Sequence, residues 1–174
     1  MMRALGPQSV SSFLKTALDV VYAGAVASVA VVGPCGLALL VLSPIIGAQG
    51  ASLFGIKLAL RPAALSAALL TLAVYLGFLI YILDRLRKMA KTLTEGDPFQ
   101  PENVGRLRLI GLGLIGLEAA NMPLRAALNW MAPSRAGAIV SFNLTAWFAV
   151  LVVFVLAEVF REGARLRREA ELTI

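Results

Sequence analysis

The sequence contains no histidine and only one cysteine, Cys35, among its 174 residues. Ser–His and Cys–His catalytic pairs and imidazole metal sites are therefore excluded, and no disulfide can form within the chain. Cys35 lies in an apolar run, where a lone cysteine usually behaves as a small buried hydrophobic residue. Acid–base chemistry also lacks paired carboxylates. We therefore expect no metal, no cofactor and no enzymatic activity.

Charged residues are scarce as well. They make up 15% of the chain against 59% hydrophobic residues, with a mean hydropathy of +0.84, whereas soluble domains average about 25% charged residues. Four apolar runs have close to the ~20 residues that a helix needs to cross a bilayer, and an isolated strand would leave its backbone unsatisfied in lipid. These runs cover residues 18–42, 63–83, 107–128 and 137–157. The sequence predicts one all-α membrane domain over residues 1–174, with four transmembrane helices in an antiparallel bundle, and an amphipathic tail over residues 158–174.

The first apolar run has an alternative interpretation as a cleaved signal peptide. Arg3 and Lys15 precede it, and small residues follow at positions 27–30. The run continues well past that point, however, and is longer than the 7–15 residues of a signal-peptide core. Pro34 directly before Cys35 also argues against a lipoprotein cleavage site. The favoured interpretation is a retained transmembrane helix.

Lysine and arginine are distributed unevenly between the two ends of the predicted helices. Twelve of the 16 basic residues fall in the N-terminal segment, the loop between the second and third runs, and the tail. Cytoplasmic loops carry the excess of positive charge, so both termini are expected in the cytoplasm. The net charge of +6 is attributed to this bias. Acidic residues are interleaved with basic ones in the tail, and no direct nucleic-acid binding is expected.

The first outer loop, residues 43–62, has an alternating pattern. Apolar Phe54, Ile56, Leu58 and Leu60 alternate with Gly55, Lys57, Ala59 and Arg61. A period of two is typical of a short strand with one apolar face. We therefore expect a strand-like segment in this loop, across the outer ends of the helices.

Local signals predict how individual helices begin, bend and pair. Asn103 is a suitable N-cap for the third helix. Pro34 and Pro123 lie inside apolar runs, and each is expected to kink or end its helix. Lys15 and Asp19 are four residues apart, a spacing that allows an ion pair on one helix.

Small residues at a spacing of four allow close helix packing. They are Ala23, Gly24, Ala27 and Ser28 in the first run, and Gly116 and Ala120 in the third. Packing within one chain is the favoured interpretation. Packing between chains of a homo-oligomer is the alternative.

A polar stripe runs along the outer half of the third predicted helix. It consists of Glu118, Asn121, Arg125 and Asn129. At 100° per residue these positions lie within about 80° of one another. A charge inside a bilayer costs roughly 2.5–3.5 kcal/mol, so it should face a partner or a cavity. One interpretation is a polar pocket or ion path centred on Glu118; the favoured one is a structural hydrogen bond to a neighbouring helix.

Two predicted cytoplasmic stretches carry a resemblance to a known family. They are Gly96-Asp97-Pro98-Phe99-Gln100-Pro101-Glu102-Asn103 and Leu156-Ala157-Glu158-Val159-Phe160-Arg161-Glu162-Gly163-Ala164-Arg165-Leu166. They resemble the signature segments of the bacterial YoaS-like membrane family, domain of unknown function 2975, and the resemblance covers essentially the whole chain. It implies a bacterial inner membrane protein without an established activity. It also implies a partner, because members are often encoded beside a small helix-turn-helix regulator of the Cro/repressor type.

We expect the two stretches to meet at the predicted cytoplasmic face and to form either a clasp or a partner surface. The residues concerned are Gly96, Asp97, Pro98, Phe99, Glu102, Asn103, Glu158, Phe160, Arg161, Gly163 and Leu166. A structural clasp would pack Phe99 on Phe160 and form polar bonds across. A binding epitope for a cytoplasmic protein is the alternative, and contact with anionic lipid heads is the simplest explanation of the basic charge.

The favoured function is a non-enzymatic membrane protein whose cytoplasmic docking surface tethers or regulates a helix-turn-helix regulator. The alternative is a small oligomeric transporter or channel that uses the Glu118 stripe.

Overall fold

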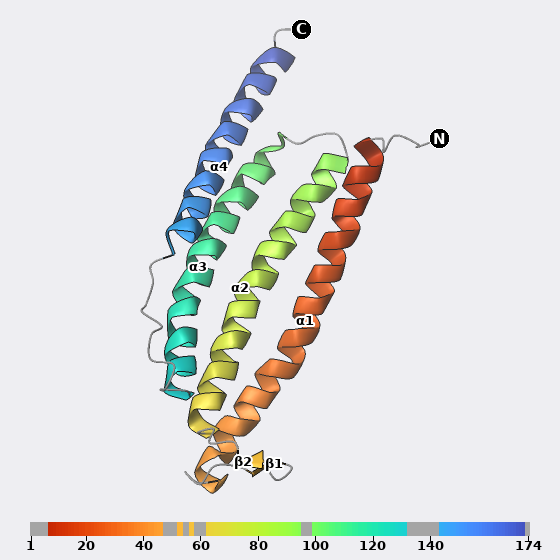
Figure 1. The fold of residues 1–174 in the computed structure, drawn as a ribbon. Helices are drawn as coiled ribbons and strands as arrows, with labels where there is room; N and C mark the ends of the chain where they lie inside the picture. The colour runs from red at the N-terminus through yellow and green to blue at the C-terminus, as the bar shows by residue number, and fades with distance from the viewer. Residues whose placement is uncertain are drawn as a thin grey trace, which may run out of the picture. The chain divides into compact units, whose positions relative to one another are not determined.

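The computed structural model describes residues 7–46, 52–53, 56–57, 62–94, 99–131 and 143–172. These residues form helices α1 (Pro7–Ile46), α2 (Pro62–Thr94), α3 (Pro101–Met131) and α4 (Leu144–Glu171), and strands β1 (Ser52–Leu53) and β2 (Ile56–Lys57) (Figure 1). Each of the four helices is long and apolar enough to cross a membrane. The prediction of an all-helical, multi-pass membrane protein with four spans is confirmed.

Proline and capping residues explain where the helices begin. Three helices start with a proline, at Pro7, Pro62 and Pro101. Proline suits the first helical position, because its φ is already helical and its missing N–H has no acceptor there. The fourth helix is capped instead by Asn143, whose side-chain oxygen accepts a hydrogen bond from the Ala146 amide at 3.3 Å.

Two predicted helix starts differ from the structure. The N-cap prediction for Asn103 is wrong: α3 begins two residues earlier, and Asn103 lies fully buried in its first turn. The fourth helix begins at Leu144 instead of near Gly137, because Asn143 has non-helical dihedrals and caps it. Residues 137–142 lie outside the part of the chain that the structure describes.

The prolines inside the apolar runs do not end their helices. Pro34 lies within α1 and Pro123 within α3, and both helices continue on either side. A proline removes one backbone hydrogen bond. Long membrane helices tolerate this loss where neighbouring groups satisfy the freed carbonyl.

The strands form a minimal antiparallel hairpin. Ser52 pairs with Lys57 and Leu53 with Ile56. Of the alternating segment expected over residues 54–61, only residues 56–57 are described. One continuous strand across this segment is therefore not supported.

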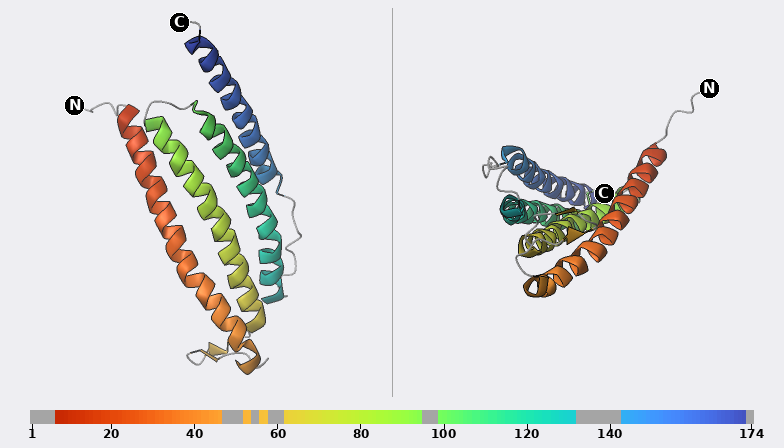
Figure 2. Two further views of the ribbon diagram at one scale, coloured as in Figure 1. Left: turned by 180° about the vertical axis from the view of Figure 1, so that it is seen from behind. Right: turned by 60° about the horizontal axis from the view of Figure 1, so that its bottom comes forward.

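The chain divides into two compact units. Unit 1 comprises Met1–Gly24, Leu79–Ile115 and Asn143–Ile174, and unit 2 comprises Ala25–Phe78 and Gly116–Phe142. In unit 1 the segments of α1, α2, α3 and α4 follow one another side by side in chain order (Figures 1 and 2). Every candidate for a docking surface lies in unit 1, whereas the polar stripe of α3 lies in unit 2.

Close packing in unit 2 depends on two glycines. A Cβ on Gly36 of α1 would lie 3.1 Å from the Leu69 Cβ of α2. A Cβ on Gly116 of α3 would lie only 2.3 Å from the Cε1 of Phe78, also on α2. Gly116 and the buried Ala120 therefore pack within the chain. The small residues of α1 behave differently, since Ala23, Gly24, Ala27 and Ser28 are all exposed, and the prediction that they pack within the chain is wrong.

Much of the apolar surface is left uncovered. Only 11% of the most apolar window of α1, and 11% of that of α4, is buried inside the protein. Phe13 and Phe148, for example, are 75% and 66% exposed. Contiguous apolar surface of this extent is unstable in water, and it implies contact with the lipid bilayer.

Candidate functional site

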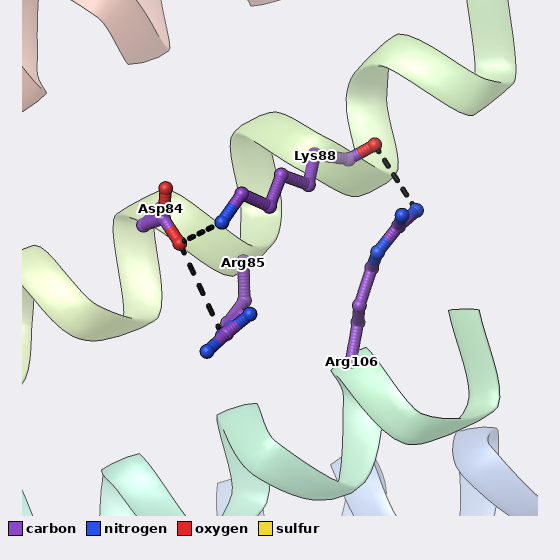
Figure 3. Close-up of polar contacts among 4 residues, drawn as sticks. All are labelled: Asp84, Arg85, Lys88 and Arg106. Carbon is purple, nitrogen blue, oxygen red and sulfur yellow. Dashed lines mark hydrogen bonds and ion pairs between the residues drawn. The ribbon is translucent and has the colours of Figure 1, made fainter. Parts of the chain in front are cut away.

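The candidate site lies in unit 1, where the last turns of α2 meet the first turns of α3. Asp84 of α2 accepts a hydrogen bond from Lys88 Nζ at 2.7 Å and lies 4.0 Å from Arg85 Nε (Figure 3). The Arg85 Nε is buried and has no hydrogen-bond partner among the described residues. Its guanidinium lies 5.1 Å from the centre of the Tyr81 ring. This cation–π contact offsets part of the free-energy cost of burying the unbonded Nε.

Asn103 joins α3 to α2. Its side-chain amide donates to Thr92 Oγ1 at 2.8 Å, and its side-chain oxygen accepts from Arg106 at 2.7 Å. Arg106 also donates to the backbone carbonyl of Lys88 at 3.3 Å (Figure 3). Asn103 and Thr92 are 0% and 5% exposed. Since buried polar groups are costly unless bonded, this network fixes the two helices against each other.

Asp19 joins α1 to α2. Its Oδ1 accepts a hydrogen bond from Arg87 Nε at 2.5 Å, and the Arg87 guanidinium lies 4.4 Å above the Tyr22 ring. The partner predicted for Asp19 from helical spacing was Lys15, and the structure pairs it with Arg87 instead. The two side chains are 35% and 40% exposed, so solvent screens this link more than the Asn103 network.

An aromatic contact joins the start of α3 to α4. The rings of Phe99 and Phe160 are 5.4 Å apart at an interplanar angle of 44°. Gly163, less than one turn further along α4, makes room for this arrangement: a Cβ there would lie 2.7 Å from Phe99 Cδ1. The structure thus brings Phe99, Phe160 and Gly163 together.

The described acidic and basic residues of the expected clasp do not pair across the two helices. Glu158 pairs with Arg161 in the next turn of α4 itself. Glu102 is exposed in the first turn of α3, and Leu166 is 55% exposed on α4. The remaining predicted members, residues 96–98, lie outside the described residues.

A pocket of about 420 Å³ lies between the first turn of α3 and the second half of α4. We call it the arginine pocket; it is lined by Pro101, Val104, Arg161, Glu162, Ala164, Arg165 and Arg168. Three guanidinium groups and one carboxylate line it, and Glu158 and Glu169 also pair with Arg161 and Arg165. Of the lining residues, only Arg161 belongs to the clasp or partner surface predicted from the sequence. The i, i+4, i+7 spacing of the three arginines was the signal that could have indicated the pocket.

The polar stripe of α3 lies in unit 2, and hydrogen bonds link only some of its described residues to one another. Arg125 Nε donates to the Asn121 side-chain oxygen at 3.3 Å, one turn away. Glu118 is half-buried and makes no hydrogen bond or ion pair with another described residue. Two hydroxyls of α2 in the same unit bond to their own helix: Ser66 donates to the Ala63 carbonyl and Thr71 to the Ala67 carbonyl. The structure does not describe the Asn129 side chain.

Comparison with known proteins identifies a family but no solved or characterised relative. No curated protein and no solved structure matches the chain. A family profile described as "Protein of unknown function (DUF2975)" matches residues 15–174. This match includes all of α2, α3 and α4, most of α1 and every residue of the candidate site. The chain therefore belongs to the DUF2975 family of proteins of unknown function.

Proposed function

We propose that this protein is a non-enzymatic scaffold of the bacterial cytoplasmic membrane, with both termini in the cytoplasm. Its cytoplasmic partner docks on the outer face of the second half of α4. We identify that partner as a small helix-turn-helix regulator from the family resemblance alone.

The observation that carries the proposal is the exposed apolar pair Val159 and Leu166. They are 56% and 55% exposed and seven residues apart, so they share one face of α4. Charged residues surround them, and the last apolar run of α4 ends near Ala157. Apolar side chains that recur at this spacing on a charged helix are typical of helices that dock into a groove.

The orientation of this face is supported by charge. Most basic residues fall on the side of the termini and of the loop between α2 and α3, as in cytoplasmic segments. A partner in the cytoplasm would therefore meet the second half of α4. The aromatic contact of Phe99 with Phe160 and the Asn103 bond would hold this half in place.

The proposal is tested by co-purification of the full chain with a helix-turn-helix regulator of the Cro/repressor type, of the kind often encoded beside members of the family that the sequence resembles. We expect capture by the unmodified protein and at least a tenfold loss with Leu166→Lys, because hot-spot side chains at interfaces contribute about 2 kcal/mol or more. Leu172→Lys is the matched control, since Leu172 is 82% exposed and lies on another side of α4. No capture by the unmodified protein, or equal loss with both variants, would contradict the proposal.

A second candidate function is a small oligomeric transporter or channel. It is favoured by Glu118, a half-buried carboxyl within a membrane span that lacks a partner among the described residues. Such residues mark ion pathways when they face a cavity, and four helices would need several copies of the chain to enclose a pore. Cation and proton flux into proteoliposomes tests this function. The unmodified protein should show flux, Glu118→Gln should abolish that flux, and Asn121→Ala should leave it in place.

A further inference from the structure

We infer that the arginine pocket, with the apolar groove beneath it on α4, binds one anionic phospholipid of the leaflet next to unit 1. The phosphate would occupy the pocket and an acyl chain the groove. This inference does not rest on the proposed function, because it concerns another face of α4. At 100° per residue, Arg161, Arg165 and Arg168 lie within about 60° of one another and about 100° or more from Leu166.

The pocket lies at the depth of lipid headgroups. The apolar run of α4 ends near Ala157, and Arg161 follows four residues later, about 6 Å along the helix at a rise of 1.5 Å per residue. On α3, Val104 precedes the first residue of the apolar run, Leu107, by about 4.5 Å. Headgroups occupy roughly the 5–8 Å outside the hydrocarbon core, so both walls of the pocket reach the phosphate layer.

The charge of the pocket suits a phosphate. Arg168 has no ion pair with another described residue, while Arg161 pairs with Glu158, and Arg165 pairs with Glu162 at 2.7 Å and with Glu169 at 3.5 Å. These pairs are within one helix and largely exposed, a class of contact that contributes only a few tenths of a kcal/mol. A phosphate can therefore recruit the same guanidinium groups, which bind its oxygens in a bidentate manner.

A separate observation points to a lipid as the source of that phosphate. An apolar groove of about 600 Å³ is lined by residues 144–154 of α4, including Trp147, Leu151 and Phe154. Phe154 precedes Arg161 by seven residues, which places it on the same face about 10 Å deeper along the helix. An arginine-lined pocket and an apolar groove on the same face, about 10 Å apart along the helix, match a headgroup joined to its acyl chain. A soluble phosphate compound would leave the groove unused.

The inference is tested with the full chain in detergent, by native mass spectrometry during titration with phosphatidylglycerol or phosphatidylcholine. We expect an apparent affinity for phosphatidylglycerol about tenfold higher, a difference of 1.4 kcal/mol. In Arg161→Gln/Arg168→Gln the preference should fall below about twofold. The control Arg108→Gln/Arg167→Gln removes the same charge outside the pocket and should keep the preference.

Three outcomes would overturn the inference. Equal binding of the two lipids by the unmodified protein would exclude an anionic headgroup site. Equal loss in both double variants would mean that only the overall charge matters. Displacement of phosphatidylglycerol by millimolar inorganic phosphate, with no loss in Phe154→Ser, would assign the pocket to a soluble phosphate instead.

Discussion

Asn103 of α3 and Thr92 of α2 share a hydrogen bond of 2.8 Å between side chains that are almost wholly buried. The Thr92 hydroxyl donates a hydrogen bond to the Met89 carbonyl at 2.7 Å, and Arg106 donates to the Asn103 oxygen. The network thus uses Asn103 both as donor and as acceptor. Removing that residue would deprive the Thr92 hydroxyl of α2 and the Arg106 guanidinium of α3 of one hydrogen-bond partner each.

Replacing Asn103 by alanine should destabilise unit 1. Loss of a buried hydrogen-bonding group typically costs about 1–3 kcal/mol. Unfolding of the purified protein in detergent measures the loss, and Asn121→Ala is the matched control, because its bond to Arg125 is longer and only part-buried. In a double-mutant cycle with Thr92→Val, the two effects should be non-additive by about 0.5–3 kcal/mol. Strict additivity would show that the two residues are not coupled.

Gly163→Ala should destabilise the contact between α3 and α4, because the new Cβ would lie 2.7 Å from Phe99 Cδ1. Gly105→Ala is the control on α3: nothing lies within 4 Å of a Cβ there. It should be neutral or stabilising, since alanine favours a helix by up to about 1 kcal/mol over glycine. Phe99→Ala should suppress the effect of Gly163→Ala. Equal melting temperatures for the two glycine variants would refute this account.

Arg87→Gln should weaken the contact of α1 with α2, whereas Lys15→Gln should not. Arg87 both bonds Asp19 and stacks on Tyr22. Because these side chains are more than a third exposed, the expected loss is modest, about 0.5–1 kcal/mol. Arg87→Lys should restore only part of it, since lysine lacks the planar guanidinium that stacks. Thermal unfolding of the three variants decides between the partner observed for Asp19 and the one predicted from spacing.

Membrane orientation can be read from single cysteines placed in a Cys35→Ser background, which contains no other cysteine. In intact cells, a membrane-impermeant maleimide should label Ser52→Cys in β1 but not Leu172→Cys at the end of α4. Permeabilisation should expose Leu172→Cys as well. The reverse pattern would invert the proposed orientation and place the α4 surface outside the cytoplasm.

The spans could be predicted from sequence because apolar length is a property of each segment alone. Boundaries set by contacts between segments could not. Asn103 carries a good local N-cap signal, yet its bond to Thr92, eleven residues earlier in the chain, places it inside α3. Asp19 had a plausible partner four residues away at Lys15, but its actual partner is 68 residues distant.

In the candidate site, too, some features could be predicted from the sequence, and others depend on contacts between helices. Two recognisable segments of sequence predicted one cytoplasmic surface that includes Phe99, Phe160 and Gly163. The structure places Phe99 against both of the other residues. The arginine pocket also needs Pro101 and Val104 from another helix. No spacing along α4 could reveal that wall. Glu118 could be named as an unusual charge, but whether it has a partner depends on the neighbouring helices.

The order of contacts in unit 1 has a consequence for biogenesis. Asp19 of α1 meets α2, Thr92 of α2 meets α3, and Phe99 at the start of α3 meets α4, so each helix contacts the one synthesised before it. Each of these contacts needs only helices that have already been synthesised, and none has to wait for a later one. A chain emerging from the ribosome could therefore assemble this unit helix by helix. Its arginine pocket would be completed only when the last helix has left the exit tunnel.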